Sequence, residues 1–385
     1  MKKKIVFADF VEYNDPSSKL GNYHYCNAYV NDGYEALWVS NSFNQLIYLK
    51  NRQDYKFKKS ISAAARHELA PDIYGFAAYA WRLYGNYAFS RKAKIALNQE
   101  KYIVPNAYQS LRAMRFDEVD ILWISNPKLY WLTNVVKYER LVYRMADDYA
   151  KFKEFPNIEA IESRLMNKAD QILVTSAKLM DKVRDAGRVP HLISNGVQFG
   201  FFHSSAPHEP EEYKISKRPK IVYVGAIKYW LDAELIERLA AAIDADIYLI
   251  GHVEADLSRL EMLANVHILG ARAYTSIPAY LKHANVAIIP FKKNEATDAV
   301  SPIKLYEYCS AGIAVVTSDM EEVKRSGAPV HVARDSGDFI EAVRRYLKEG
   351  YDPSSLIEFG RENSWDKRYE TVRDILEKKE YQSHA

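Results

Sequence analysis

Short runs of apolar and β-branched residues alternate along the chain with stretches whose apolar positions recur at helical spacing. Strands that alternate with helices in this way predict βαβ crossovers and a parallel sheet. Many of the runs are apolar on both faces, as expected for strands buried between layers of helices. The runs cover residues 4–8, 36–40, 119–124, 171–175 and 191–194 in the first half, and 220–224, 246–250, 265–269, 285–290 and 313–318 in the second.

A segment rich in Pro, Ser and charge, residues 204–219, lies between the two sets of strands. It lacks a core pattern and predicts an interdomain linker. A chain of 385 residues also fits two domains better than one core. We therefore expect an α/β protein with a Rossmann-like first domain at 1–203 and a Rossmann-like second domain at 220–363.

The last part of the chain, about 364–385, predicts a single helix. Asn363 or Ser364 can serve as its N-cap. One face of this helix carries the apolar stripe of an amphipathic helix. The stripe consists of Tyr369, Val372, Ile375 and Leu376.

The composition of the chain mainly excludes classes of protein. Hydrophobic residues make up 48% and the formal net charge is +3, which indicates a globular chain without a strong nucleic-acid signal. Two distant cysteines, Cys26 and Cys309, predict neither a disulfide framework nor a zinc site and favour a reducing cytoplasm. The start, MKKKIVFADF, predicts a first strand rather than a signal peptide. No stretch approaches the ~20 apolar residues that span a bilayer, so we expect any membrane contact to be peripheral.

Glycines follow three predicted strands of the second half. Gly225 ends the strand before Lys228, and Gly251 and Gly270 follow the next two strands. Glycine lets the backbone approach a phosphate closely, and Lys228 can add a positive charge. Ligands of open α/β sheets bind at the carboxyl ends of strands, so these glycines are candidates for a pocket rim. Each of them also fits an ordinary strand-to-helix turn.

The segment SPIKLYEYCSAG, residues 301–312, carries the strongest chemical signal. Ser301 and Pro302 fit the start of a helix. The amides of Ile303 and Lys304, with the Lys304 ammonium, can then hold a diphosphate at the positive end of the helix dipole. Glu307, one turn further on, can accept the two hydroxyls of a ribose. The alternative is a surface helix with an ordinary Lys304–Glu307 pair.

The second half resembles the nucleotide-sugar domain of GT-B glycosyltransferases. The resemblance is carried, in this order, by GAIKYW (225–230), HILGARAYTSIPAYLKHANVAIIPF (267–291) and SPIKLYEYCSAGIAVVTS (301–318). SNGV at 194–197 and NSWDKR at 363–368 resemble the same family, so the likeness extends over essentially the whole chain. Within the family, the pattern is similar to that of bacterial polysaccharide enzymes such as the xanthan and teichuronic acid glucuronosyltransferases.

The resemblance implies two Rossmann-like domains that face each other across a cleft, with the final helix returning to the first domain. It places Ala271, Arg272 and Ala273 beside the base of the donor. It places Ser301–Lys304 at the diphosphate and Glu307 at the ribose. It implies a UDP-sugar as the donor and no further cofactor.

One departure from the family pattern bears on the mechanism. Retaining members often carry two glutamates eight positions apart, and the second of them matches Glu307. The first would fall on Ala299, while Glu295 and Asp298 miss that position. The sequence therefore favours an inverting mechanism.

An inverting transfer requires a general base on the acceptor hydroxyl. Asp147 and Asp148 are adjacent, and their repulsion can raise one pKa towards a useful value. The named relatives commonly have a comparable pair, and we prefer Asp147 as the base. The alternative is an acidic N-cap for the helix that holds Ile158 and Ile161. His24 is a further candidate for contacting acceptor or donor, and a structural role is its alternative.

A DxD sequence, Asp244-Ala245-Asp246, precedes its strand instead of following it. Metal-binding DxD motifs of the other major glycosyltransferase fold follow a strand. We therefore expect a helix-to-strand turn here and no required metal.

The stretch 81–115 is basic and rich in aromatic residues, and its single acid is Glu100. Such a stretch can lie on an anionic leaflet and receive a lipid-linked acceptor. A solvated helix face is the alternative. The absence of an RNA-binding motif makes RNA a less favoured partner. The stretch contains Arg82, Arg91, Lys92, Lys94, Lys101, Arg112 and Arg115, interleaved with Tyr84, Tyr87, Phe89, Tyr102 and Tyr108.

Together these features predict an inverting, metal-independent glycosyltransferase. It would move a sugar, with glucuronate as one candidate, from a UDP-sugar to a polysaccharide, glycolipid or lipid-linked acceptor. The expected location is the cytoplasm, with possible attachment to the inner face of the plasma membrane. The alternatives are a sugar-nucleotide epimerase of the same fold and a non-catalytic nucleotide-sugar or membrane scaffold.

Overall fold

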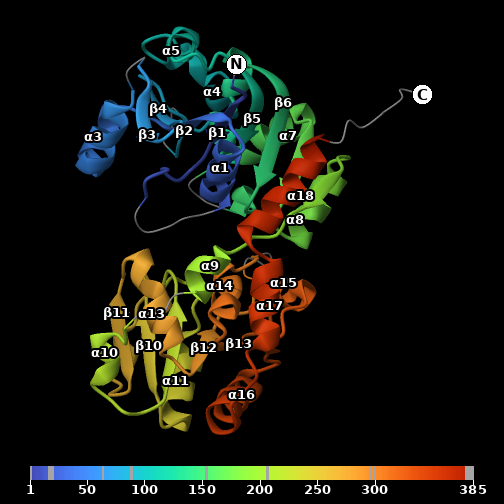
Figure 1. Ribbon diagram of the computed structural model, residues 1–385. Coiled ribbons are helices and arrows are strands. Elements are labelled where there is room, and N and C mark those ends of the chain that lie inside the picture. Colours follow the sequence, from blue (N-terminus) through green and yellow to red (C-terminus); the bar gives the residue numbers. More distant parts are fainter. Residues whose placement is uncertain are drawn as a thin grey trace. The chain divides into compact units, whose positions relative to one another are not determined.

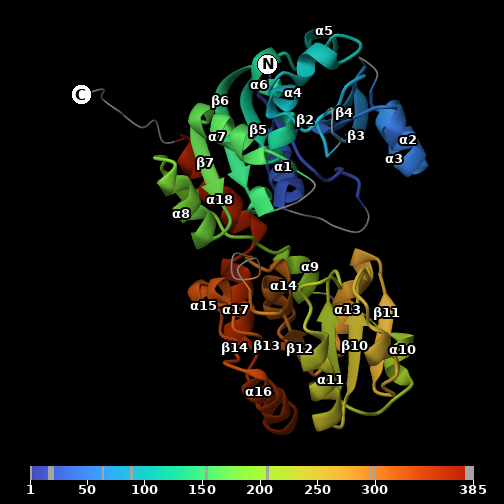
Figure 2. The same ribbon diagram turned by 180° about the vertical axis from the view of Figure 1, so that it is seen from behind.

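The computed structural model describes residues 2–15, 21–62, 65–86, 90–151, 155–204, 208–294, 297 and 300–377. These residues form two compact units (Figures 1 and 2). The first unit contains the described residues up to Ile193, together with Ile375–Glu377, and the second contains Ser194–Asp374.

The first unit is built on an eight-stranded sheet of order β3-β4-β2-β1-β5-β6-β7-β8. All neighbouring strands are parallel except β3 and β4. The strands are β1 (Lys4–Ala8), β2 (Glu35–Phe43), β3 (His67–Ala70), β4 (Ile73–Tyr79), β5 (Glu118–Ile124), β6 (Lys137–Met145), β7 (Gln171–Val174) and β8 (Pro190–Leu192).

The helices of the first unit include α2 and α3, which lie at the edge of the sheet beside β3 and β4 in both views (Figures 1 and 2). The α-helices are α1 (Gly21–Asn31), α2 (Gln45–Lys50), α3 (Arg52–Ser60), α4 (Ala93–Leu97), α5 (Ala107–Ala113), α6 (Leu132–Val135), α7 (Ile158–Lys168) and α8 (Ala177–Asp185). Short 3₁₀ turns are η1 (Gln99–Tyr102), η2 (Pro127–Leu129) and η3 (Tyr149–Lys151).

The second unit contains a six-stranded, fully parallel sheet of order β11-β10-β9-β12-β13-β14. Numbered within the unit, this order is 3-2-1-4-5-6, the doubly wound arrangement of dinucleotide-binding folds. The strands are β9 (Lys220–Val224), β10 (Asp246–Ile250), β11 (Val266–Gly270), β12 (Val286–Ile289), β13 (Ala314–Thr317) and β14 (His331–Val332).

The helices of the second unit include α16, which packs against β13. The α-helices are α9 (Phe199–His203), α10 (Glu211–Lys214), α11 (Ala233–Ala242), α12 (Ser258–Glu261), α13 (Ile277–Lys282), α14 (Ile303–Ala311), α15 (Glu321–Ser326), α16 (Ser336–Glu349), α17 (Ser354–Glu362) and α18 (Trp365–Glu377). One 3₁₀ turn is η4 (Tyr274–Ser276).

Each expected strand is present within a few residues, because buried parallel strands carry an unbroken apolar signal. Four further strands, β3, β4, β6 and β14, were not predicted. Strand β6 begins with the charged sequence KYER, so its apolar second half does not stand out as a strand. Strand β4 contains Gly75 and two alanines, which are weak strand formers. These strands are needed because β6 and β4 extend the first sheet on both sides of β1.

The described part of the expected linker, 208–219, lies within the second unit. Tyr213 on α10 is fully buried, and its ring packs 4.4 Å from that of Tyr248 and 5.5 Å from that of Tyr280. The chain passes from one unit to the other between Ile193 and Ser194, before the composition changes. The buried Tyr213 side chain therefore anchors the linker-like segment 208–219 in the core of the second unit.

The terminal helix α18 begins as expected, since the Ser364 hydroxyl accepts a hydrogen bond from the Lys367 amide at 3.3 Å. Of the predicted stripe, Tyr369, Val372 and Leu376 are buried and Ile375 is partly buried. The last described turn of this helix, Ile375–Glu377, groups with the first unit. The expected helical residues 378–385 lie outside the described residues.

Candidate active site

The carboxyl ends of β9 and β10 meet at a close backbone approach. Gly225 has φ +147° and Gly251 has φ +155°, values that side chains of L residues rarely allow. A Cβ on Gly251 would lie 1.9 Å from the Gly225 carbonyl oxygen, and a Cβ on Gly225 would lie 2.9 Å from Cε of Lys304. These two glycines therefore leave room for the neighbouring backbone and for the Lys304 side chain.

Helix α14 is fixed to the end of β9 by Tyr308. The Val224 amide donates to the Tyr308 hydroxyl oxygen at 2.8 Å, and that hydroxyl donates to the Val224 carbonyl at 3.1 Å. Strands β9 and β12 are neighbours at the point where the strand order reverses. The start of α14 thus stands at the switch point where doubly wound sheets bind their ligands.

The SNGV segment supports the loop before α14. The Asn195 side-chain amide donates to the Ser301 carbonyl at 2.9 Å, and the Ser301 hydroxyl lies 3.2 Å from that of Tyr306. The sequence suggested a helix start at Ser301 and Pro302. The Ser301 side chain, however, does not cap the helix. Pro302 occupies the N-cap position, and no side chain of the described residues caps the first turn. The first amides of α14 are consequently left for another acceptor.

Lys304 lies in the first turn of α14 among aromatic rings. Its Nζ is 4.8 Å from the ring centre of Phe291 and 5.4 Å from that of Tyr223. Desolvation lowers the pKa of Lys304 to about 8, and the nearby charge of Glu307 partly opposes this shift. An anion beside this ammonium would offset the cost of its burial.

Glu307 follows one turn later and receives a hydrogen bond from the Tyr274 hydroxyl at 3.3 Å. Desolvation raises the pKa of the Glu307 carboxyl to about 7, against the opposing effects of Lys304 and of the Tyr274 hydrogen bond. Tyr274 is held by stacking on Phe201 at 5.2 Å. The structure therefore brings a desolvated cation and a desolvated carboxyl together at the switch point.

Two other predicted positions have their side chains engaged elsewhere. Lys228 forms an ion pair with Glu254 at 2.7 Å. Arg272 is paired with Glu212 of α10 at 2.8 Å, and its Nε donates to the Tyr280 hydroxyl at 3.2 Å. Arg272 thus ties the former linker segment to the turn after β11, while Ala271 and Ala273 flank it on that turn.

In the first unit, Asp147 and Asp148 follow β6 and differ sharply in their surroundings. Asp148 pairs with Lys182 of α8 at 2.7 Å and lies 3.8 Å from Lys151. Asp147 is exposed and, among the described residues, its carboxylate has neither an ion pair nor a side-chain hydrogen bond. Desolvation by neighbouring protein raises the pKa of Asp147 to about 6; Arg144 lowers it and Asp148 raises it. Asp147 is therefore the better placed of the two to accept a proton.

The alternative role of this acidic pair, as the N-cap of the following helix, is wrong. Helix α7 begins at Ile158 and its N-cap position is Asn157. The two aspartates instead precede the 3₁₀ turn η3. His24 lies in the first turn of α1, partly buried, with its ring edge-on to that of Tyr23 at 5.3 Å.

Asp9, which follows β1, was not predicted as a site residue. It is buried and accepts hydrogen bonds from the Asn22 side chain at 2.6 Å and from the amides of Phe10 and Val11 at 2.5 and 3.3 Å. Burial raises the pKa of Asp9 despite these bonds. Asp9 thereby fixes the loop that carries Phe10 against Tyr149, two residues after Asp147. Its position directly after the first strand is the feature of the sequence that could have identified Asp9 as a candidate.

The remaining sequence features divide between the two units. Asp244 lies in the turn between α11 and β10, and Asp246 is the first residue of β10; they face Arg218 at 3.2 and 3.9 Å. Nowhere in the described chain do three or more His, Cys, Asp or Glu residues gather as a metal cluster would require. Nor does the described chain contain a helix both long and apolar enough to cross a bilayer.

Within 81–115, most basic side chains are exposed, whereas Trp81–Asn86 lines a pocket. Trp81, Val104 and Tyr108 are exposed apolar residues of this stretch. Tyr87 and Phe89 lie outside the described residues, as do the positions that bear on the retaining pattern: Glu295, Asp298 and Ala299.

Comparison with solved structures gives the same architecture over nearly the whole chain. Sucrose-phosphate synthase from Thermosynechococcus elongatus aligns with a TM-score of 0.67 at 14% identity, covering 97% of this chain and 98% of that protein. Anabaena Alr3699/HepE, solved in complex with UDP and glucose, aligns with a TM-score of 0.67 at 14% identity, covering 97% and 99%. The chain has the GT-B fold.

Sequence comparison agrees with this GT-B assignment. Residues 218–349, most of the second unit, match the family model described as glycosyl transferases group 1. TuaH of Bacillus subtilis (strain 168), which is named as a glycosyltransferase of teichuronic acid biosynthesis, is 28% identical over 256 residues. That match covers 60% of this chain and 64% of TuaH. The match to the family model includes both Lys304 and Glu307.

Proposed function

We propose that the protein is an inverting, metal-independent glycosyltransferase that moves a sugar from a UDP-sugar to a polysaccharide, glycolipid or lipid-linked acceptor. The observation that carries the proposal is the Lys304–Glu307 pair at the switch point of a 3-2-1-4-5-6 sheet. UDP is the proposed nucleotide because the similar Anabaena protein was solved with UDP. Glucuronate is the proposed sugar on the resemblance alone.

The proposed donor contacts follow from the geometry of the second unit. The uncapped first turn of α14 offers backbone amides, and Lys304 offers a cation for the diphosphate. Gly225 keeps the space beside Lys304 open. Glu307 accepts the ribose hydroxyls, and Tyr274 holds its carboxylate in place. As UDP leaves, the charge on its diphosphate is stabilised by Lys304 and by the helix amides.

The proposed base is Asp147 of the first unit. The acceptor oxygen attacks the anomeric carbon, the bond from that carbon to the diphosphate breaks, and the hydroxyl proton passes to the Asp147 carboxylate. A pKa of about 6 leaves Asp147 largely ionised at neutral pH and still able to take up a proton. We further propose that the basic face of 81–115 meets an anionic membrane surface, and that His24 contacts a substrate.

The first test is the affinity for UDP. Glu307→Ala is expected to weaken UDP binding by roughly 10- to 100-fold, because hydrogen bonds to a charged group contribute about 1.5–3 kcal/mol. Titration calorimetry of the folded variant measures this. Glu358→Ala, an exposed glutamate on α17, is the matched control and should bind UDP normally. Unchanged UDP affinity in Glu307→Ala would remove the ribose role from this residue.

The pH dependence of UDP binding is a second prediction. Below a pH of about 7 the Glu307 carboxyl gains a proton, and above about 8 the Lys304 ammonium loses one, so affinity should be highest between these values. Calorimetry from pH 5.5 to 9.5 checks this. Glu307→Gln should flatten only the acid side and Lys304→Met only the alkaline side. The phosphate of UDP itself titrates at about pH 6. A wild-type affinity for UDP that does not change with pH above that value would contradict the prediction.

A further inference from the structure

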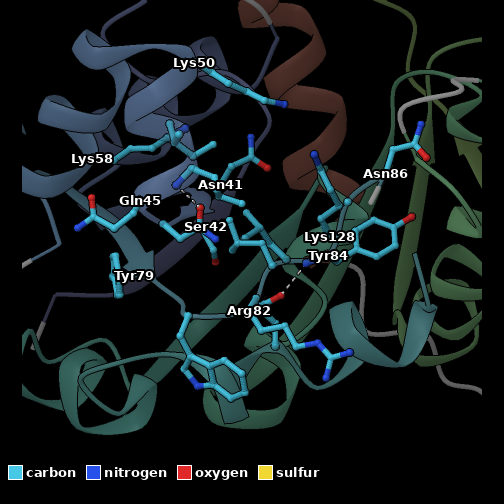
Figure 3. Close-up of a pocket in the computed structure, with 18 of the residues that line it drawn as sticks. Asn41, Ser42, Gln45, Lys50, Lys58, Tyr79, Arg82, Tyr84, Asn86 and Lys128 are labelled. Carbon is cyan, nitrogen blue, oxygen red and sulfur yellow. Dashed lines mark hydrogen bonds between the residues drawn. The ribbon is translucent and has the colours of Figure 1, made fainter. Parts of the chain in front are cut away.

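A pocket of about 780 Å³ opens within the first unit, which does not contain Lys304 or Glu307 (Figure 3). Its walls come from the last residues of β2 and β4, from the segments after β2, β4 and β5, and from α3, Gln99 and Phe155. These segments follow the carboxyl ends of parallel strands that flank the β1–β5 switch point. In Figure 3, Lys128 and Tyr84 lie on one side, Lys58 and Gln45 on the other, and Asn41 and Ser42 between them.

The charge of the pocket has one sign. Four lining residues, Lys50, Lys58, Arg82 and Lys128, are cationic, and none of the described lining residues is Asp or Glu. A concave site with charges of one sign and low-dielectric walls attracts ligands of the opposite charge. The pocket therefore favours an anion.

Lys128 differs from Lys58, another cation of the pocket lining, in its charged partners. Within the described residues its ammonium forms no ion pair, whereas Lys58 is paired with Asp54 at 3.0 Å and with Glu12 at 3.6 Å. Desolvation, together with the charge of Lys58, lowers the pKa of Lys128 to about 8. The rings of Phe155 and Phe10, at 4.4 and 5.3 Å, compensate part of this cost. A bound carboxylate or phosphate would compensate the rest.

The other lining groups suit a sugar ring. Ser42 has a buried hydroxyl that lacks a hydrogen-bond partner among the described residues, and Gln45 presents an exposed amide. Trp81 is 61% exposed and stands at the pocket with Tyr79 and Tyr84. Hydroxyls and amides pair with sugar hydroxyls, while aromatic faces cover the apolar side of a sugar ring.

Two ring contacts link one wall of the pocket to the loop that carries the proposed base. The Phe10 ring lies 5.5 Å from that of Phe155, which lines the pocket, and 4.9 Å from that of Tyr149. Tyr149 follows Asp147 by two positions. The Phe155 wall is therefore the side of the pocket from which a bound acceptor would reach towards Asp147.

We propose that this pocket holds a sugar residue of the acceptor that carries a carboxylate or a phosphate, and that Lys128 binds this anionic group. The inference rests on the proposed function, because it assigns the pocket to the acceptor. It narrows the acceptor class from any glycan or glycolipid to one with a negative charge near the reacting sugar.

The test is calorimetric binding of three probes to the full chain: a disaccharide ending in glucuronate, its counterpart ending in glucose, and the glucose disaccharide carrying a phosphate. The wild type should bind one or both anionic probes at least tenfold more tightly than the neutral one. Lys128→Met, which keeps the packing on Phe155, should lose roughly ten- to a hundredfold of that affinity, as for a hydrogen bond to a charged group. Lys128→Arg should retain it, and Lys59→Gln, an exposed lysine outside the pocket, should change nothing.

The comparison between the two anionic probes shows whether a carboxylate or a phosphate is the preferred group. Equal affinity for charged and neutral probes, or a Lys128→Met variant that binds as the wild type does, would overturn the inference. Circular dichroism and thermal unfolding, compared with the wild type, show whether these first-unit variants are folded. Failure of the wild type to bind UDP would instead overturn the proposed function. The preference of the pocket for anionic probes is measured without UDP and is therefore tested independently.

Discussion

Asp147→Asn is expected to lower the rate of glycosyl transfer by roughly 10²–10⁴-fold while leaving UDP affinity unchanged. The asparagine keeps the size of the side chain and removes its ability to accept a proton. Asp147 is exposed, its pKa is raised to about 6, and it belongs to a different unit from the Lys304–Glu307 pair. Steady-state transfer assays with saturating UDP-sugar, beside UDP calorimetry, measure the two effects separately.

Asp148→Asn is the matched control for this prediction. Its carboxylate already pairs with Lys182, so its removal should cost at most about 1 kcal/mol of stability and little activity. If Asp148→Asn loses transfer while Asp147→Asn keeps it, the two roles must be exchanged. If both variants transfer normally, the base lies elsewhere and the inverting mechanism loses its proposed proton acceptor.

Gly251→Ala is expected to destabilise the second unit by roughly 3–5 kcal/mol, by combining backbone strain with overpacking. The alanine Cβ would lie 1.9 Å from the Gly225 carbonyl oxygen, which is backbone and cannot rotate away. The φ of +155° adds strain of its own. Because Gly225 borders Lys304, any surviving folded protein should also bind UDP more weakly. Chemical denaturation and UDP calorimetry measure these effects.

Gly270→Ala tests whether the collision, rather than positive φ alone, causes the loss. Gly270 ends the next strand with φ +68° and has open space where a Cβ would lie. Its substitution should therefore cost only about 1–2 kcal/mol of strain. Equal losses in the two variants would show that the close approach of Gly225 and Gly251 contributes nothing to stability.

Much of the proposed donor site follows from local sequence. The run KIVYVG predicts a buried strand with a special residue at its end, and SPIKLYEY predicts a helix that starts with a lysine and a glutamate one turn apart. Both patterns are contained within a dozen residues, so short-range chemistry suffices to find them. The pairing of Lys228 with Glu254 and of Arg272 with Glu212 could not be found in this way, because each partner comes from a separate element.

The proposed acceptor site depends on contacts between distant parts of the chain. Asp9 and Asn22 meet because β1 and α1 fold back on one another, and no spacing rule connects them. Lys128 looked like an ordinary loop lysine. It stands out only because the rings of Phe10 and Phe155 and the charge of Lys58, which come from three other segments, lie close to it, and because none of the described residues forms an ion pair with it.

The sequence by itself determined the alternation of strands and helices, the class of fold and the residues proposed to bind a nucleotide. Each of these depends on local periodicity and turn chemistry. The tertiary structure decided which of two adjacent aspartates is paired, where the linker-like segment packs, and that Lys128 of the pocket has no ion pair among the described residues. Those outcomes depend on desolvation and on neighbours that only folding brings within a few ångströms.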